Sequence, residues 1–416
     1  MMSDNPSNHA SEEIKTLARI MRGNVGIIIL TWTILHIGSG LTFPLFPRFL
    51  EELGASPSMI GIVSAIGYLV ITLQLIGGYL ADRYGRKRLI VVTSFILTVS
   101  MPLFICAKDW TWVLVGLILT NVAAMSGPAI WAILADSTRY EYRGRIYSLS
   151  WIVPEIVLTP TACLLAYVVS IYGIVNGVKI GYVVYFTMAL ISTILKAYFL
   201  KETHDVTSHT EKPGITSLFR DIISALKTSS RKYRLLLIYL LVQSPATAVI
   251  FIYYVLYLAH IVGLSDSELS LIFAAANGFY LIFALGLGVL LDRVERVKLL
   301  YPLILLQMIG LLLLILYAYN FITALFVSFL VLSVAFVTTY AHSVLEADFT
   351  YEETRGRLLG VATVVKSSGF IFGSIVGGVL YELSATVPFV MCIALYLASL
   401  FVLTLIYYPR RSQIQT

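Results

Sequence analysis

Runs of about twenty apolar residues recur along the whole chain, and each is long enough to cross a hydrocarbon layer of roughly 30 Å as a helix. The chain is 58% hydrophobic and only 12% charged, with a mean hydropathy of +0.87. A soluble domain carries about 25% charged residues and could not bury this much apolar surface. The alternating segments of a membrane β-barrel are not seen. The sequence therefore predicts an all-α polytopic membrane protein.

We count twelve such runs and expect two bundles of six helices, separated by a polar linker. Within the linker, apolar residues at helical spacing from Ile215 to Leu226 predict an amphipathic helix. The predicted regions are a polar cytoplasmic arm at 1–23, a first bundle at 24–200, the linker at 201–234, a second bundle at 235–408 and a tail at 409–416. The predicted spans are 24–47, 58–80, 88–107, 110–135, 146–171, 179–200, 235–259, 267–291, 298–318, 321–347, 358–381 and 386–408.

Lys and Arg are distributed unevenly between the two ends of the spans. If the N-terminus is inside, 24 of the 29 Lys and Arg residues fall in the inner segments. Inner loops carry this excess, so both termini are predicted to lie in the cytoplasm, with the protein in the cytoplasmic membrane. The net charge of +6 is then a feature of topology, and no nucleic-acid partner is expected.

Two charged segments occur twice, about half a chain apart. Residues 78–88 return at 288–298, an offset of 210 residues, and residues 136–145 return at 348–357, an offset of 212. Internal duplication in a membrane protein points to a transporter whose site lies between the two copies.

The first segment resembles the signature Gly-x-Leu-x-Asp-Arg-x-Gly-Arg-[Arg/Lys] found between spans two and three of the major facilitator superfamily. The second copy departs from it at Glu295, which stands where the first has Gly85, so a different loop geometry is expected there. The resemblance extends to the span count and to the duplication, and it implies two pseudo-symmetric six-helix bundles around a central site. The matching residues are Gly78, Leu80, Asp82, Arg83, Gly85, Arg86 and Lys87, then Gly288, Leu290, Asp292, Arg293 and Arg296.

The resemblance also implies that these charged segments form a cytoplasmic gate. Gly78 would let span two approach a neighbouring helix closely, and Asp82 would lie at the N-terminus of span eleven, where free N–H groups favour a carboxylate. Arg83 or Arg86 would reach Asp136, and the second copy would act symmetrically on span five. For the second copy, a role in topology alone is the alternative. The other residues of the predicted gate are Gly85, Arg143, Gly288, Asp292, Arg293, Arg296, Asp348 and Arg355.

Three ionisable residues lie deep within predicted spans, where a charge is costly and marks function. They are His36 in span one, Glu155 in span five and Lys366 in span eleven. Glu155 is a candidate proton-coupling carboxylate, Lys366 a candidate anion binder or partner of Glu155, and His36 a candidate proton relay. The alternatives are a fixed ion pair between Glu155 and Lys366 and a buried, satisfied imidazole at His36.

Further cavity candidates come from spans four, seven and ten, which line the cavity in the resembled family. Amide and phenol groups there indicate a small organic, amphiphilic solute, although some tyrosines would instead lie at the membrane interface. On span eleven, Gly369, Gly373 and Gly377 indicate a tight helix-packing face. The cavity candidates are Asn121, Gln243, Tyr253, Tyr254 and His342, accompanied by Thr338, Thr339 and Glu346.

The sequence predicts a secondary active transporter that moves a small organic solute across the lipid bilayer by alternating access, coupled to protons or another ion. Export is slightly favoured over uptake, on analogy with the fold alone. A receptor that binds a ligand without flux is the alternative. Spacings typical of enzyme sites are not found, so we expect no enzymatic activity, cofactor or metal. The isolated Cys106, Cys163 and Cys392 predict buried, inert thiols.

Overall fold

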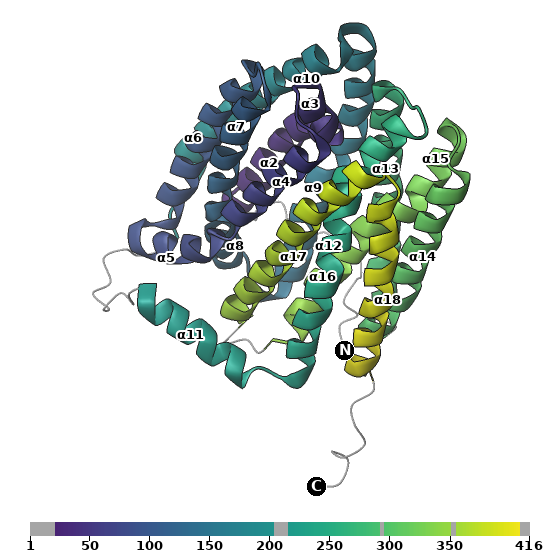
Figure 1. The fold of residues 1–416 in the computed structure, drawn as a ribbon. Helices are drawn as coiled ribbons and strands as arrows, with labels where there is room; N and C mark the ends of the chain where they lie inside the picture. Colours follow the sequence, from purple (N-terminus) through teal and green to yellow (C-terminus); the bar gives the residue numbers. More distant parts are fainter. Residues whose placement is uncertain (1–20, 204–214, 292–294, 351–354, 408–416) are drawn as a thin grey trace, which may run out of the picture.

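The computed structural model describes residues 21–203, 215–291, 295–350 and 355–407. Within these ranges the chain forms helices joined by short turns, with no β-strand. Eleven helical stretches there are long and apolar enough to cross a membrane, and Figure 1 shows them packed side by side. The predicted all-α polytopic fold is confirmed.

Most spans of the N-terminal half are interrupted, because two or three shorter helices follow one another along a single crossing. The first span also continues beyond its predicted end, as far as Glu52. The helices of this half are α2 (Asn24–Gly40), η1 (Phe43–Leu45), α3 (Phe46–Glu52), α4 (Pro57–Ile71), α5 (Gln74–Tyr84), α6 (Arg86–Ile105), α7 (Trp110–Val122), η2 (Ala123–Ser126), α8 (Gly127–Asp136), η3 (Tyr140–Tyr142), α9 (Arg143–Ile156) and α10 (Leu158–Phe199).

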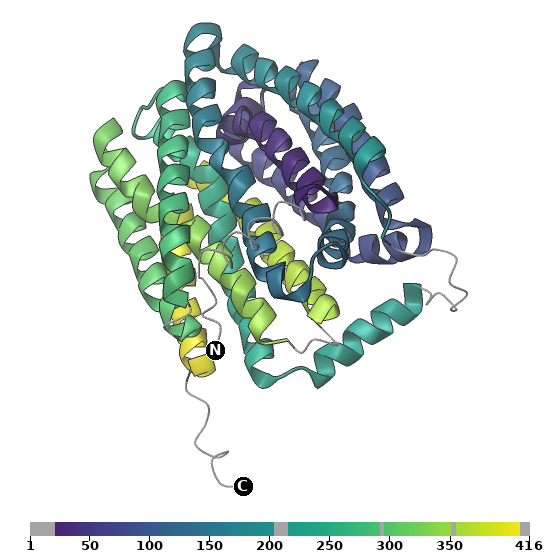
Figure 2. The ribbon, with the colours of Figure 1, turned by 180° about the vertical axis from the view of Figure 1, so that it is seen from behind.

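α10 has 42 residues, far more than one crossing requires. Its backbone leaves the helical region at Gly173, where φ is 71° and ψ is 168°, and the chain reverses there, at the top of Figure 2. Spans five and six therefore belong to one continuous stretch, Arg143–Phe199. The eleven stretches correspond to the twelve crossings that the sequence predicts.

The C-terminal half consists mainly of continuous helices. Its exception is the tenth span, in which the π-helix η4 (Phe329–Ser333) joins α15 (Phe321–Ser328) to α16 (Val334–Asp348). The other helices are α12 (Arg231–His260), α13 (Asp266–Leu291), α14 (Arg296–Tyr317), α17 (Arg355–Leu383) and α18 (Val387–Tyr407).

Proline accounts for several of the helix boundaries, because it lacks the N–H that a helix interior needs and fits the first turn. Pro44 and Pro47 lie at the starts of η1 and α3, and Pro128 lies at the start of α8. Pro245 instead lies inside the uninterrupted α12. At the α4–α5 break the Leu69 carbonyl accepts from both the backbone N–H of Thr72, at 3.2 Å, and the Thr72 hydroxyl, at 2.6 Å.

The turn between α5 and α6 requires a glycine. Gly85 has a φ of 95° and a ψ of 140°, a conformation that strains any residue with a Cβ. Glu295, at the corresponding position of the second copy, has a φ of −58°. The two turns therefore differ in backbone geometry, as the sequence predicts.

The close approach expected at Gly78 occurs one residue earlier. A Cβ on Gly77 would lie 2.0 Å from the Met125 carbonyl oxygen of η2, whereas a Cβ on Gly78 would meet nothing nearer than the Pro128 Cβ at 3.8 Å. Successive residues on a helix point about 100° apart. Gly77 therefore faces η2, and the prediction for Gly78 is corrected.

The glycines of α17 form a tight packing face against α12, and this prediction is confirmed. A Cβ on Gly369 would lie 2.7 Å from the Ser244 Cβ, and a Cβ on Gly377 would lie 2.7 Å from the Tyr253 ring. At Gly373 the nearest atom is the Pro245 carbonyl oxygen, at 2.3 Å. The backbone of α12 passes directly over this face.

Gly373→Ala should loosen this contact, because the new Cβ would overlap backbone atoms that cannot move independently. Overpacking of this kind costs about 1–3 kcal/mol. We expect a lower melting temperature of the purified protein, measured by tryptophan fluorescence. Gly144→Ala is the matched control, since a Cβ there would meet nothing within 4 Å. Equal melting temperatures for the two variants would contradict the assignment.

The ends of the spans form two rims. The edge at the bottom of Figure 1 holds Arg86 and Arg296, and we call it the Arg86 rim. The opposite edge holds Arg48, and we call it the Arg48 rim. The linker helix α11 (Ile215–Thr228) lies along the Arg86 rim in both views and contacts α17. The predicted linker helix is thus present, although most side chains of its apolar stripe lie outside those described.

The two halves meet chiefly through α4 with α17 and α10 with α13. Near the Arg48 rim, a Cβ on Gly61 would lie 2.2 Å from the Ser374 carbonyl oxygen. Further along the same pair of helices, the rings of Tyr68 and Phe370 lie 4.5 Å apart between centroids. The halves therefore approach each other closely on the Arg48 side.

Candidate functional site

Glu155 and His36 face each other from α9 and α2. His36 Nε2 lies 3.9 Å from Glu155 Oε1, and the two side chains are 30% and 19% exposed. The other ring nitrogen, Nδ1, donates to the Trp32 carbonyl oxygen at 2.8 Å, because a carbonyl can only accept. This bond fixes the ring so that Nε2 points to the carboxylate.

The backbone beside Glu155 is bonded to the other half of the molecule. α9 ends at Ile156 and α10 begins at Leu158, so Glu155 lies at a helix break. The buried Asn277 of α13 donates to the Glu155 carbonyl oxygen at 3.3 Å and to Thr159 Oγ1 at 3.2 Å. A relative movement of the halves would therefore alter the surroundings of Glu155 directly.

Lys366 pairs with Glu346 and not with Glu155. Its Nζ lies 2.7 Å from Glu346 Oε1, with Lys366 27% and Glu346 only 5% exposed. The pairing of Lys366 with Glu155 considered from the sequence is corrected. Equivalent positions in two repeats lie in different halves, and Glu346 of the adjacent α16 already satisfies the ammonium.

His342 lies one turn before Glu346 on α16 and is fully enclosed. Its Nε2 lies 2.8 Å from the Tyr239 hydroxyl, and the two rings meet edge to face at 5.2 Å. His342 is therefore a buried, satisfied imidazole within the C-terminal half and does not line an open cavity.

The remaining polar candidates also lie in helix contacts. The Tyr253 hydroxyl donates to the Ser374 carbonyl oxygen at 2.6 Å, and the Tyr254 hydroxyl lies 2.6 Å from Ser328 Oγ. Gln243 is buried, with Thr247 Oγ1 3.3 Å from its Oε1. Asn121 packs against α4, since a Cβ on Gly67 would lie 3.0 Å from its Nδ2.

Aromatic rings lie beside the His36–Glu155 pair, one helical turn toward the Arg86 rim. Trp32 precedes His36 by four residues and Trp151 precedes Glu155 by four, so each tryptophan shares a helix face with its ionisable neighbour. The Trp131 ring lies between them, 5.4 Å from Trp32 and 5.8 Å from Trp151 between centroids. Sequence reasoning missed this juxtaposition, although the spacing of four was visible. We call Trp32, Trp131, Tyr147 and Trp151 the aromatic layer.

At the Arg86 rim, Arg86 forms an ion pair with Asp136. The same guanidinium donates to Thr203 Oγ1 at 3.1 Å, and the Lys87 backbone N–H donates to Glu202 Oε2 at 2.9 Å. The beginning of the linker is thus bonded to the first charged segment. This contact of the linker was not anticipated from the sequence.

The second charged segment repeats this ion pair. Arg296 Nη1 donates to both carboxylate oxygens of Asp348, at 2.5 and 2.6 Å. Asp82 is exposed and forms no ion pair with a described residue, and a Cβ on Gly356 would meet nothing within 4 Å. Among the residues that the structure describes, the expected contact of Asp82 with the start of α17 is therefore not seen. Arg83 donates to the Tyr79 hydroxyl at 2.8 Å, and Arg143 begins α9. Asp292 and Arg293 lie outside the described residues, and so do the surroundings of Gly288 and the side chain of Arg355.

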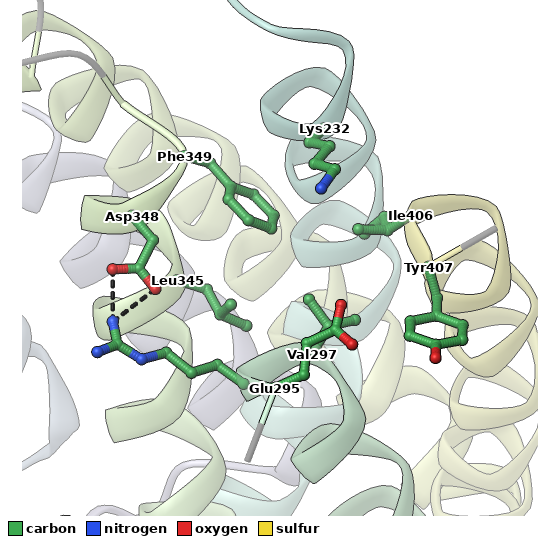
Figure 3. A pocket seen from close by; sticks show the side chains of 9 residues that line it. Lys232, Glu295, Val297, Leu345, Asp348, Phe349, Ile406 and Tyr407 are labelled. Atoms are coloured by element: carbon green, nitrogen blue, oxygen red, sulfur yellow. Dashed lines mark hydrogen bonds and ion pairs between the residues drawn. The ribbon is translucent and has the colours of Figure 1, made fainter. Parts of the chain in front are cut away.

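A cavity of ≈ 350 Å³ opens beside the Arg296–Asp348 pair, between the ends of α12, α14, α16 and α18. Figure 3 shows the Lys232 ammonium and the Glu295 carboxylate directed toward it from opposite walls. It lies within the C-terminal half and apart from the mid-membrane ionisable groups. Its lining residues are Lys232, Glu295, Arg296, Val297, Leu345, Asp348, Phe349, Ile406 and Tyr407.

The Arg48 rim holds ion pairs that join the halves, and sequence reasoning missed them. Arg48 Nε of α3 lies 3.1 Å from Asp266 Oδ1 of α13. Glu51 Oε1 of α3 lies 3.0 Å from His260 Nε2 of α12. The two partners of each pair lie at the ends of different spans, so no local spacing brings them together. Charged residues are common at the ends of spans, so these four did not stand out in the sequence.

The sequence profile of the Major Facilitator Superfamily matches residues 28–257 and again residues 235–415. The chain belongs to this superfamily. The fold, the two related halves and both charged segments agree with that membership, and the protein is accordingly a multi-pass membrane transporter.

Relatives within the Major Facilitator Superfamily match most of the chain. Multidrug resistance protein 1 of Bacillus subtilis is 25% identical over 378 residues, covering 87% of this chain and 91% of that protein. Multidrug resistance protein 2 of the same organism is 26% identical over 397 residues, covering 91% and 92%. The quinolone resistance protein NorA of Staphylococcus aureus matches a shorter part, 25% identical over 28% of this chain and 30% of NorA.

Solved structures share the superfamily fold at low identity. The nucleoside transporter NupG superposes with a TM-score of 0.72 over 92% of this chain and 100% of that chain, at 12% identity. A POT family peptide transporter gives a TM-score of 0.73, covering 93% and 97%, also at 12% identity. Both show the same arrangement of helices.

Proposed function

We propose that this transporter exports small organic solutes from the cytoplasm in exchange for protons, opening alternately at the Arg86 rim and the Arg48 rim. The His36–Glu155 contact carries the proposal. Because Nδ1 donates to the Trp32 carbonyl, a neutral imidazole presents an unprotonated Nε2 to Glu155. Two acceptors then face each other, and a single proton on either group turns this repulsion into attraction. The pair is suited to bind one proton.

The position of the pair supports a role in the transport cycle. Asn277 of the C-terminal half bonds the carbonyl oxygen of Glu155, so separation of the halves on this side would break that bond. The carboxylate would then meet a different environment in each state, and its affinity for a proton would change with it. A proton site that senses the position of the halves is what coupling requires.

The aromatic layer supports an organic solute. Aromatic rings bind apolar groups and also attract cations over their faces. A solute held there would lie one helical turn from Glu155, so a cationic solute and a proton would compete for the same carboxylate. Competition of this kind gives exchange, because one carboxylate cannot hold both at once.

The relatives support the direction of transport. Two of them bear the name multidrug resistance protein and match over most of this chain. The excess of Lys and Arg at the Arg86 rim favours the cytoplasmic side for that rim. Export would therefore begin with a solute that enters from the Arg86 rim.

The proposal is tested with purified protein in liposomes that carry an imposed pH gradient. Fluorescent small organic compounds of cationic, neutral and anionic charge are offered, and their movement is followed with and without the gradient. We expect gradient-dependent movement of at least one class, abolished by a protonophore. Transport that ignores the gradient would overturn proton coupling, and binding without flux would overturn transport itself.

The aromatic layer gives this assay a matched pair of variants. Trp151→Ala removes an exposed face of the layer, and loss of one stacking contact is expected to weaken solute binding roughly threefold to tenfold. Trp112→Ala, on the exposed surface of α7 outside the layer, should leave the half-saturating concentration unchanged. Equal effects of the two variants would exclude the layer as the solute site.

A further inference from the structure

We propose that the Arg48 rim is a proton-sensitive lock, in which His260 binds a proton and thereby holds the two halves together on that side. The proposal rests on the alternating cycle proposed above, but it concerns a second group far from Glu155. It begins with how α3 is held. Arg48 is only 14% exposed and contacts Glu51 and Glu52 on its own helix as well as Asp266 of α13.

His260 completes this cluster from the last turn of α12. Its Nε2 lies 3.0 Å from Glu51 Oε1, and its Nδ1 lies 3.1 Å from the Tyr381 hydroxyl of α17. Glu51 therefore lies between Arg48 of its own half and His260 of the other half. The imidazole in turn links α3 to two helices of the C-terminal half.

Both protonation states of His260 fit this geometry, but they differ in strength. In the neutral ring, the Tyr381 hydroxyl donates to Nδ1 and Nε2–H donates to Glu51. In the imidazolium, Nδ1–H donates to the Tyr381 oxygen, and a full positive charge faces the carboxylate. The acceptor is a carboxylate in both states, and the imidazolium adds the Coulombic attraction between two opposite charges whose atoms lie 3.0 Å apart. A proton thus tightens the link without requiring any atom to move.

The charge balance of the rim also bears on its closure. Arg48 is accompanied by three carboxylates that contact it, so the cluster is negative while His260 is neutral. Repulsion among carboxylates opposes closure of the rim, and the imidazolium offsets part of it. The ionisable groups on the elements packed around His260 are Arg48, Glu51 and Glu52 of α3, Asp266 and Glu268 of α13, Tyr381 and Glu382 of α17, and Tyr257 of α12 itself.

The contacts of the lock join the two halves, so the rim cannot open while they are intact. α3 contacts α12 of the other half, and α17 is bonded to the start of α4 by the Glu382 carboxylate, which accepts from the Ser58 N–H at 3.0 Å. Opening at this rim must separate Glu51 from His260 and Arg48 from Asp266. Acid on the Arg48 side would therefore slow opening, and alkali would favour it.

The test measures the rim directly and needs no solute. Cys106 and Cys163 are exposed and Cys392 is buried, so the sequence prediction of buried thiols is confirmed for Cys392 and wrong for the other two. For labelling, Cys106 and Cys163 are changed to Ser and Cys392 is kept. Spin labels are attached at Lys108→Cys and Tyr319→Cys, two exposed positions at the Arg48 rim on opposite halves. Pulsed electron paramagnetic resonance in lipid nanodiscs then gives the distance between the halves at about pH 5.5 and about pH 8.5, on either side of the range in which histidine titrates.

We expect the population with the longer separation to rise roughly threefold to fivefold at the higher pH, as suits a partly exposed ion pair. His260→Gln keeps two hydrogen-bonding groups without the charge, and it should remove the pH response. Arg48→Ala should raise the longer population at both pH values. A pH response that survives in His260→Gln, or a rim that stays closed in Arg48→Ala, would overturn the lock.

Glu155→Gln separates this proposal from the proposed function. If the lock is correct, the labelled Glu155→Gln protein still opens with rising pH, even when its proton-driven transport is lost. If Glu155→Gln abolishes the response and His260→Gln retains it, the mid-membrane pair governs the rim and the lock is wrong.

Discussion

Glu155→Gln should abolish the accumulation of solute that a proton gradient drives. Glutamine keeps the size of the side chain and can still bond His36, but it cannot take up and release a proton. A driving force of about 100 mV is worth about 2.3 kcal/mol per proton, which corresponds to a roughly fiftyfold concentration ratio. The variant should lose this ratio entirely in the liposome assay, while movement down a solute gradient persists.

The conservative variant Glu155→Asp provides the control, because it retains a titratable carboxyl group at a greater distance from His36. It should accumulate solute at a reduced rate. His36→Gln should shift the pH at which transport is half-maximal, since the carboxyl group loses the neighbour with which it shares the proton. Full gradient-driven accumulation by Glu155→Gln would contradict the role of this residue.

Lys366→Met should destabilise the protein strongly. The substitution leaves the Glu346 carboxylate, which is 5% exposed, in a buried site without its cation. Removing one partner of a buried ion pair costs about 3–5 kcal/mol, and the partial exposure of Lys366 favours the lower end of this range. We expect a clearly lower melting temperature in detergent, measured by tryptophan fluorescence or by the fraction that stays monodisperse after heating.

Two further variants show whether the lost cation is the cause. The double variant Glu346→Gln with Lys366→Met removes both charges and should recover most of the stability. Lys196→Met is the matched single control, because the buried Lys196 donates to the Ser94 hydroxyl at 3.1 Å and pairs with no carboxylate among the described residues. A double variant as unstable as Lys366→Met would show that packing, rather than charge, dominates at this position.

The fold could be predicted because membrane crossings depend on few variables. Length and hydropathy fixed the twelve spans, and the paired charged segments indicated the duplication. The break at Gly173 fell within the predicted loop because a glycine there follows a run already long enough for one crossing. The π-helix η4 was not predicted, since its residues are as apolar as their neighbours and include no proline.

The site was harder to predict because its contacts depend on tertiary structure. Glu155, His36 and Lys366 were found individually, since a charge within a long apolar run is conspicuous. Their partners were not, because the nearest opposite charge comes from whichever helix lies adjacent in space. Lys366 thus pairs with Glu346, twenty residues earlier, and Arg48 pairs with Asp266 in the other half. Such pairs leave no spacing that a single sequence can show.

The uneven continuity of the spans has a mechanical consequence. An interrupted helix lacks some of its i→i−4 hydrogen bonds at the break, so it bends there at lower cost than an intact one. The N-terminal half carries such breaks at Thr72, at η2 and beside Glu155, whereas among the described spans of the C-terminal half only the tenth is interrupted, at η4. The helices of the C-terminal half would then bend less than those of the N-terminal half when the two halves move. Elastic deformation during each turnover would be concentrated in the half that carries the proton-binding carboxylate.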